Sequence, residues 1–151
     1  MKIKLIKFRK NLIPPVRAHY NDAGIDCFAQ EEFSLNPFGS TIQVENEITR
    51  YADRRTIPLG FGLEIPDGYM AVIKPRSSMN AAGIITQIGT IDSGYRGEIK
   101  AIFINTSPYT SCTFMKGDKI CQIVIEPVIL ADIVEDLGDE RGDGGFGSTG
   151  K

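Results

Sequence analysis

One short segment groups the side chains that bind phosphate best. In PRSSM, residues 75–79, Arg76 offers a planar fork of N–H donors, and Ser77 and Ser78 offer hydroxyls. A guanidinium and neighbouring hydroxyls can donate together to the oxygens of a phosphate chain. Pro75 fixes the backbone before them, and a helical turn can follow. Taken alone, the segment fits a phosphate site and an ordinary surface turn about equally well.

A second segment carries one carboxylate between glycines. In GTIDSGYRGEI, residues 89–99, Asp92 follows Gly89 and precedes Gly94 and Tyr95. A carboxylate beside a tight turn can point into a cleft and hold a water molecule, although carboxylates are weak bases at neutral pH unless their site strengthens them. The alternative is a turn aspartate that accepts hydrogen bonds from its own backbone.

The chain ends in RGDGGFGSTGK, residues 141–151, which combines glycines with Arg141 and Phe146. The glycines fit G-x-G-x-x-G, and the segment comes close to a P-loop, with Ser148 in place of the lysine. Both motifs need a following helix whose N-terminus holds the phosphate, and too few residues remain to form one. Composition favours a flexible tail, whereas an arginine and an aromatic ring favour a binding role.

Short apolar runs between turn residues must position these side chains. The expected strands are 2–6 (KIKLI), 60–65 (GFGLEI), 69–75 (YMAVIKP), 89–92 (GTID), 95–105 (YRGEIKAIFIN) and 120–130 (ICQIVIEPVIL). Turns at 66–68 and 93–94 predict that the second and third runs, and the fourth and fifth, form hairpins. Helical pieces are expected only at 79–83 and in VENEITRYADRR, residues 44–55. Many short strands predict an all-β sandwich, jelly roll or barrel.

Length and charge limit the class of protein. The 151 residues predict one domain, with 42% hydrophobic and 24% charged residues. The net charge of −2 gives no field that would attract nucleic acid. No stretch approaches the ~18 apolar residues of a membrane span, so we expect a soluble, cytoplasmic protein. Basic residues alternate with Ile3 and Leu5 at the start of the chain, which is typical of the exposed face of an edge strand.

The cysteines favour a reducing compartment. Cys27, Cys112 and Cys121 show no C-x-x-C spacing, and His19 is the single histidine. A Cys/His metal site is therefore not expected. We expect three reduced core thiols.

Taken together and in order, these segments resemble the five motifs of the trimeric dUTP pyrophosphatase (dUTPase) family. The five are AGIDCFA (23–29), PRSSM (75–79), GTIDSGYRGEI (89–99), KGDKICQI (116–123) and RGDGGFGSTG (141–150). The resemblance spans 23–150 and implies a distorted jelly-roll (β-clip) body. The glycine-rich composition places the end of that body near residue 136, and 137–151 would form a mobile C-terminal flap. The family also implies a homotrimer, with sites at subunit interfaces.

The resemblance implies hydrolysis of dUTP to dUMP and pyrophosphate, which limits uracil incorporation into DNA. Asp92 would orient and deprotonate the water that attacks the α-phosphorus, and would hold the sugar 3′-hydroxyl. Tyr95 would pack under the deoxyribose and exclude a 2′-hydroxyl. Phe146 of the flap would stack on uracil, and Arg141 would pair with the γ-phosphate. The other implied substrate contacts are Arg76, Ser77, Ser78, Gln87, Gly89, Thr90, Ile91, Lys100, Gln122, Gly147, Ser148 and Thr149.

Within that set the roles differ. The backbone at 89–91 and at Lys100 would read the uracil edge, and Gln122 would contact phosphate from a neighbouring subunit. Mg²⁺ is implied as the cofactor and would bind mainly through the triphosphate, with Asp26 holding it through water. Because Mg²⁺ usually keeps waters and uses substrate phosphates, a protein cage is not required.

The sequence departs from the family pattern at three places. Thr86 stands where many members have an asparagine that binds uracil, and Gln87 follows it, as in viral members. Ser78 stands where many have glycine. The segment 44–55 is extra length, which we interpret as a surface insertion or, alternatively, a partner-binding element.

Two other functions fit parts of the sequence. A dCTP deaminase shares the fold and the Arg-Ser-Ser segment, but its catalytic glutamate would stand at Ile102. A regulatory binding protein, as among some phage relatives, would use 44–55 to contact a partner.

Overall fold

The structure, a computed structural model, describes residues 1–44, 47–51 and 54–135, with side chains for 1–39 and 54–135. Within these ranges the chain forms thirteen strands and one short helix. In chain order they are β1 (Lys4–Lys7), β2 (Ile25–Phe28), β3 (Phe33–Leu35), β4 (Ser40–Val44), β5 (Glu47–Tyr51), β6 (Arg54–Pro58), β7 (Phe61–Glu64), β8 (Tyr69–Lys74), α1 (Ser77–Ala81), β9 (Ile84–Thr86), β10 (Gly89–Ile91), β11 (Lys100–Asn105), β12 (Cys112–Phe114) and β13 (Lys119–Pro127).

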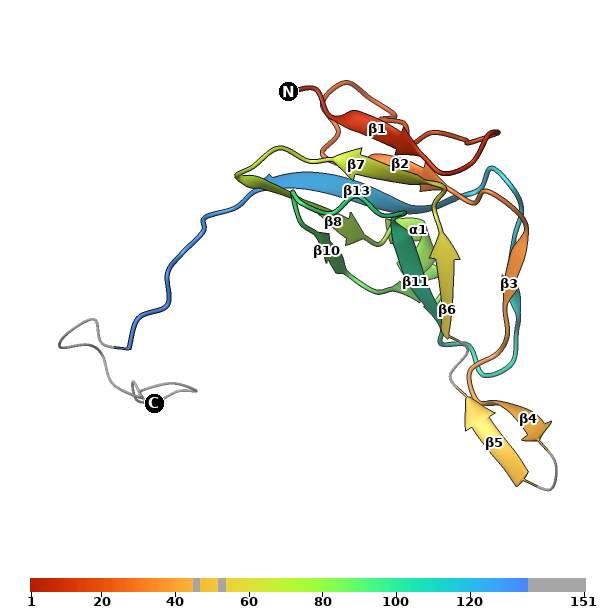
Figure 1. Cartoon of the computed structure of the whole chain (residues 1–151). Helices are drawn as coiled ribbons and strands as arrows, with labels where there is room; N and C mark the ends of the chain where they lie inside the picture. Colours follow the sequence, from red (N-terminus) through yellow and green to blue (C-terminus); the bar gives the residue numbers. More distant parts are fainter. Residues whose placement is uncertain (45–46, 52–53, 136–151) are drawn as a thin grey trace, which may run out of the picture.

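Two antiparallel sheets form the body. The larger has the strand order β10-β8-β13-β2, and the other has β6-β11-β9. Two-stranded ladders add β1-β7, β12-β3 and β4-β5. Figure 1 shows β13 and β8 crossing the middle of the body, with β1 and β7 on one side and β6 and β11 on the other. The predicted all-β jelly-roll class is confirmed.

One hydrophobic cluster joins the two sheets. It includes Ile73 and Ile123 from the larger sheet and Ala101 and Phe103 from the smaller, all at most 4% exposed. Along β11 buried and less buried positions alternate, as expected for a strand with one face on the core. The ring of Phe33 lies 6.0 Å from that of Phe103, measured between centroids. The cluster gives the strands that carry site residues a rigid support.

Both predicted hairpins are wrong, although their turns exist. Gly68 has a φ of 78°, and Tyr69 donates its backbone N–H to the carbonyl of Pro66 (3.3 Å). However, β7 pairs with β1, whereas β8 pairs with β10 and β13. Turn residues fix a local reversal but do not choose the partner strand. The first three residues of β7 are all buried, because both of its faces are covered.

The second predicted hairpin fails in the same way. Strand β10 pairs with β8, while β11 pairs with β6 and β9. Residues 92–99 form the connection instead. In it, Tyr95 donates its backbone N–H to the Asp92 carbonyl (3.1 Å) and Ile99 donates to Phe61 (2.9 Å). The connection thus crosses from one sheet to the other.

Most of the remaining local predictions are confirmed, and one is wrong. The short helix is confirmed as α1, and the strand prediction at 120–130 is confirmed by β13, which ends at Pro127. The exposed lysines of β1 confirm its expected edge position. The helix expected in 44–55 is wrong, because this part of the chain contributes to β4, β5 and β6. Its β-branched and aromatic residues favour strands, and β4 and β5 form a hairpin that projects from the body (Figure 1).

The cysteines carry no disulfide. Cys27 and Cys121 are buried and Cys112 is half-buried, and all three are free. Cys112 is less buried than expected, and the reduced state stays a prediction. The described residues contain no helix with the length and hydrophobicity that a bilayer crossing would require. The cytoplasmic location stays a prediction.

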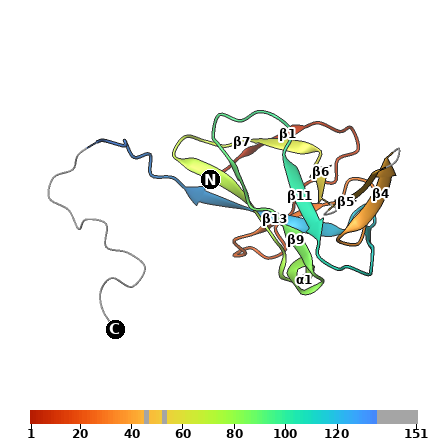
Figure 2. The ribbon, with the colours of Figure 1, turned by 90° about the horizontal axis from the view of Figure 1, so that it is seen from below.

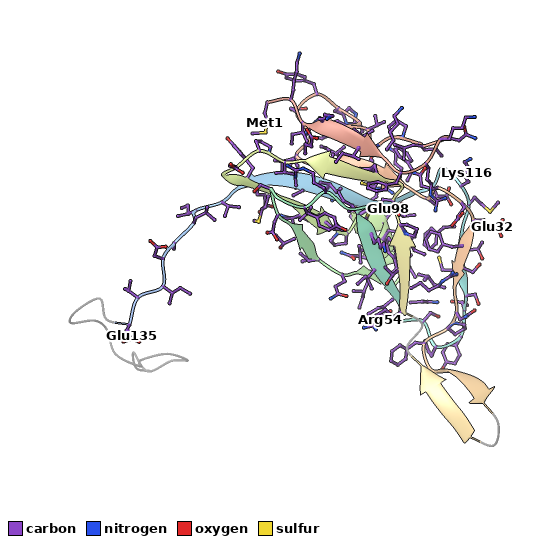
Figure 3. All side chains as sticks on the ribbon, in the orientation of Figure 1. Met1, Glu32, Arg54, Glu98, Lys116 and Glu135 are labelled. Atoms are coloured by element: carbon purple, nitrogen blue, oxygen red, sulfur yellow. The ribbon has the colours of Figure 1, made fainter. Side chains whose placement is uncertain are left out.

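The chain leaves the body after β13. Val128 donates its N–H to the carbonyl of Gly68 (2.9 Å), and this is the last backbone contact to the body among the described residues. Beyond it, Ile129, Leu130 and Ile133 are at least 86% exposed. Figures 2 and 3 show this segment, up to Glu135, standing clear of the strands. The flap expected at 137–151 lies outside the described residues, so the division at 136 stays a prediction.

Candidate active site

Three neighbouring strands bring the first group of predicted site residues together. Asp26 on β2 lies opposite Gln122 on β13, and Gln122 lies opposite Lys74 at the end of β8. Arg76 follows β8 directly and precedes α1. The segments 23–29, 75–79 and 116–123 therefore meet at one end of the larger sheet.

Asp26 is the centre of this group. Its Oδ1 lies 3.2 Å from Arg76 Nε, and its Oδ2 lies 2.7 Å from Lys119 Nζ. A guanidinium N–H of Arg76 also donates to Ser78 Oγ (3.3 Å) and to the backbone carbonyl of Lys119 (3.1 Å). Ser77 and Ser78 are exposed at the start of α1. We call Asp26, Arg76, Ser78 and Lys119 the cationic cluster.

Gln122 extends the cationic cluster. Its amide donates to the backbone carbonyl of Pro75 (2.9 Å). The amide oxygen lies so close to Gly24 that any side chain there would overlap with it. A side chain at residue 24 would therefore push the Gln122 amide out of its present position.

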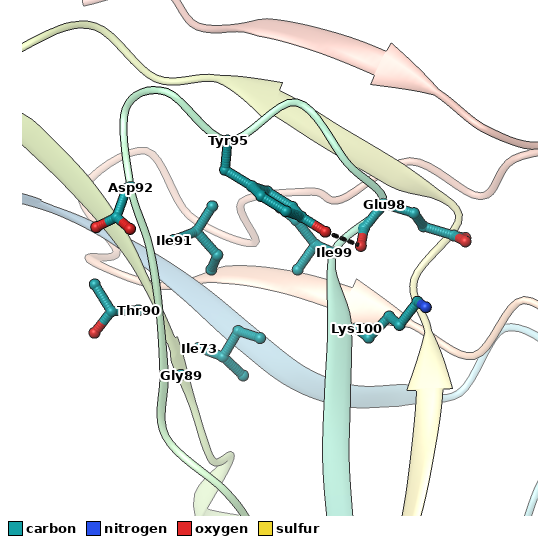
Figure 4. Close-up of a pocket in the computed structure, with 9 residues that line it drawn as sticks. All are labelled: Ile73, Gly89, Thr90, Ile91, Asp92, Tyr95, Glu98, Ile99 and Lys100. Carbon is teal, nitrogen blue, oxygen red and sulfur yellow. Dashed lines mark hydrogen bonds between the residues drawn. The ribbon is translucent and has the colours of Figure 1, made fainter.

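The second group of predicted residues lines a separate pocket, drawn in Figure 4. Its volume is about 270 Å³. Six predicted residues take part. They are Gly89, Thr90, Ile91, Asp92, Tyr95 and Lys100, which are joined by Ile73, Glu98 and Ile99. Strand β10 supplies one wall of the pocket and the start of β11 the other. The connection 92–99, which joins these two strands, closes one end.

Tyr95 is held in this pocket by its neighbours. Its hydroxyl donates to the backbone carbonyl of Glu98 (3.1 Å), which Figure 4 shows as a dashed line. The Glu98 carboxylate accepts a hydrogen bond from the Gly60 N–H (2.9 Å), which ties the connection to the body. Gly97 lies against the Tyr95 hydroxyl, so that a side chain there would overlap with it. The ring keeps 45% exposure and remains open to a ligand.

Some predicted site residues lie neither in the cationic cluster nor in the pocket. Gln87 is exposed and does not line the pocket; its backbone N–H donates to the Ile102 carbonyl (2.8 Å). Thr86 is buried, and its hydroxyl is without a partner among the described residues. The flap residues lie outside the described residues. They are Arg141, Phe146, Gly147, Ser148 and Thr149.

Two residues were missed. Lys119 lies within KGDKICQI, where the motif gives it no role, and only the pairing of β13 with β2 brings it to Asp26. Glu98 belongs to GTIDSGYRGEI, and its position in that segment was the available signal.

The described residues contain no cluster of three or more His, Cys, Asp and Glu side chains able to hold a metal ion. A single carboxylate, Asp26, lies among phosphate-type donors. This donor set fits a Mg²⁺ ion that keeps its waters and is held mainly by phosphates.

The two facing sheets, the free C-terminal segment and the two site groups define a jelly-roll protein of the dUTPase type. The family model described as dUTPase matches residues 10–150. The chain belongs to the dUTPase family. This confirms the resemblance and the predicted enzyme class, dUTP diphosphatase.

Similar proteins carry the same description. A deoxyuridine 5′-triphosphate nucleotidohydrolase of Thermobifida fusca is 38% identical over 99% of this chain and 79% of its own length. One of Clostridium kluyveri is 37% identical over 99% of both. A solved structure of the Staphylococcus bacteriophage 80alpha dUTPase with dUpNHpp superposes with a TM-score of 0.79, at 25% identity and 99% coverage of both chains.

Proposed function

We propose that this chain hydrolyses dUTP to dUMP and pyrophosphate. The observation that carries the proposal is the pocket in which Asp92 stands at the rim beside Tyr95. Its volume suits a nucleoside rather than a macromolecule. Backbone groups at 89–91, on an edge strand, can read a planar base by hydrogen bonds. The relatives described above act on deoxyuridine triphosphate.

In this mechanism Asp92 positions a water molecule and takes its proton as that water attacks the α-phosphorus. The side chain is exposed at the pocket rim (Figure 4). A positioned base of this kind contributes about 10² to 10⁴ in rate. The P–O bond to the β-phosphate breaks, and pyrophosphate leaves.

Tyr95 provides sugar selection. Its ring is fixed at the hydroxyl end by Glu98 and at the backbone by Asp92. A ribose 2′-hydroxyl placed against this apolar ring would lose water without gaining a partner, which is unfavourable. Deoxyribose has no such group.

The cationic cluster binds the phosphate chain, together with Ser77, Gln122 and the flap. Arg76 and the serines supply donors for phosphate oxygens. From the flap, Arg141 pairs with the γ-phosphate and Phe146 stacks on uracil, with Gly147, Ser148 and Thr149 close to the phosphates. Mg²⁺, when bound, would offset negative charge on the triphosphate, and Asp26 would hold the ion through water.

The active unit is a homotrimer with sites shared between copies. Ile91 lies opposite Ala71 in this antiparallel pair, so Asp92 falls level with Met70, six residues before Arg76, which lies just beyond the end of β8. At ~3.4 Å per residue, the backbones of Asp92 and Arg76 in one chain are about 20 Å apart. This separation supports the proposal that the two groups of one chain serve different sites. Sedimentation should give three times the chain mass of 16.6 kDa.

The first experiment incubates the protein with Mg²⁺ and, separately, dUTP, dCTP, dTTP or UTP, and separates the products by chromatography. Conversion of dUTP alone to dUMP and pyrophosphate supports the proposal. Ammonia and dUTP from dCTP would instead indicate a deaminase. If no nucleotide is turned over, a regulatory binding protein using 44–55 becomes the better proposal.

A further inference from the structure

The two cations on Asp26 compete with a metal ion for the same carboxylate. Arg76 occupies one oxygen and Lys119 the other. The Asp26 side chain is 15% exposed, so little of its surface is left for a third partner. A hydrated ion would gain room beside Asp26 if one of the cations left.

Arg76 is the cation that stays. Besides Asp26 it has two further acceptors, Ser78 Oγ and the Lys119 carbonyl. A planar guanidinium that contacts several acceptors at once would lose all of these contacts if it moved. Lys119 differs, because its ammonium makes this one ion pair among the described residues, at the end of a flexible stem that is 41% exposed.

We propose that Lys119 is a phosphate-binding residue that exchanges partners when nucleotide binds. Without ligand, its ammonium pairs with Asp26. With a nucleoside triphosphate and Mg²⁺ bound, the ammonium turns to the triphosphate oxygens, and Asp26 Oδ2 accepts from metal-bound water. This inference rests on the proposed function and names a further residue of the same site.

Charge favours the exchange. While Lys119 stays on Asp26 the pair is neutral, and within the cationic cluster only Arg76 presents positive charge to the ligand. A triphosphate keeps net negative charge with one Mg²⁺ bound, so a second cation adds strong charge-assisted hydrogen bonds. Asp26 is not left unpaired, because a positively charged hydrated ion replaces the ammonium. The large cost of an isolated, partly buried carboxylate is thereby avoided.

The test measures binding rather than turnover. The dissociation constants of the imido analogue dUpNHpp and of dUMP are measured by calorimetry, each with Mg²⁺ and with EDTA. The variants are Lys119→Met, which removes the ammonium, and Lys119→Arg, which keeps the charge. Lys4→Met is the matched control, because it breaks a lysine–carboxylate pair, with Glu64 at 3.0 Å, away from both site groups.

We expect Lys119→Met to weaken dUpNHpp binding about tenfold with Mg²⁺, and dUMP binding by less than about twofold. With EDTA the loss on dUpNHpp should shrink below about threefold, because nothing then releases Lys119 from Asp26. Lys119→Arg should recover most of the affinity, and Lys4→Met should match the unmodified protein. Should Lys119→Met not fold, Lys119→Gln replaces it.

Three outcomes overturn the inference. They are unchanged dUpNHpp affinity in Lys119→Met, an equal loss for dUMP, and an equal loss with and without Mg²⁺. All three presuppose that the unmodified protein binds dUpNHpp. If it binds neither ligand and does not hydrolyse dUTP, the proposed function itself fails.

Discussion

Gly97 touches the hydroxyl of Tyr95 so closely that a Cβ at residue 97 would overlap with it. The phenol is the free end of a side chain, so the ring would swing aside before the backbone moved. The hydroxyl donates a hydrogen bond to the Glu98 carbonyl, so such a shift would break the hydrogen bond that holds the ring in the pocket. If Tyr95 selects deoxyribose as proposed, this contact makes the selection sensitive to a residue that does not line the pocket.

Gly97→Ala should therefore relax sugar selection. We expect the ratio of kcat/KM for dUTP over UTP to fall about tenfold, which corresponds to about 1.4 kcal/mol of lost discrimination. Steady-state kinetics on both nucleotides measures it. Gly94→Ala is the control, since a Cβ there meets no atom within 4 Å. An unchanged ratio in Gly97→Ala would show that Tyr95 is not held through this contact.

Asp92→Asn should separate binding from chemistry. The amide keeps the size of the carboxylate and can still hydrogen-bond the sugar, but it cannot accept the proton of the attacking water. We expect kcat to fall by about 10² or more, with the dissociation constant of dUpNHpp within about threefold of the unmodified protein. Single-turnover kinetics and calorimetry provide the two values. An active Asp92→Asn would remove the proposed base.

Truncation after Asp139 removes Arg141, Phe146 and the other proposed flap residues. Activity on dUTP should fall to a small fraction, because the stacking on uracil and the γ-phosphate contact are lost. The melting temperature should change little, because the hydrophobic cluster contains no residue after Ile125 among the described residues. Kinetics and thermal unfolding measure the two effects. Full activity in the truncated protein would exclude the flap.

The buried thiols predict how stability depends on pH. A hydrogen bond with Cys121, and then burial, raise the pKa of the Cys27 thiol well above its ordinary value. The unfolded thiol ionises near pH ~8.5, while the folded one keeps its proton. The unfolded state therefore binds fewer protons above that pH, and the free energy of unfolding falls as pH rises. Below that pH the thiol is protonated in both states and does not make the free energy of unfolding depend on pH.

Denaturant unfolding between pH 7 and pH 10 tests this prediction. The unmodified protein should lose more stability over the range than Cys27→Ala, because only the former contains this thiol. The difference between the two proteins removes the contribution of other groups that titrate there. Parallel curves would contradict the assignment.

Local signals in the sequence predicted strands and turns well but not their partners. The turn at 66–68 is present, yet β7 and β8 belong to different sheets, because the burial of both faces of β7 depends on strands far away in sequence. The helix expected at 44–55 was wrong because this segment pairs as strands, and the pairing is not visible in the sequence.

For the site too, local motifs are visible in the sequence, whereas contacts between distant strands are not. Arg76, Asp92 and Tyr95 could be picked out from the sequence because they lie in motifs that follow one another in the family's order, and their roles stay predictions. Lys119 was not, because its meeting with Asp26 depends on the register of β13 against β2, which the sequence does not display. The separation between Asp92 and Arg76 likewise follows from the pairing of β10 with β8.

That separation has a genetic consequence. If each site takes Asp92 from one copy and Arg76 from another, two different defects need not fall in the same site. A cell that carries one gene with Asp92→Asn and another with Arg76→Ala would assemble mixed trimers, some of whose sites contain both intact residues. Two inactive alleles would then restore part of the activity when expressed together, although neither does so alone.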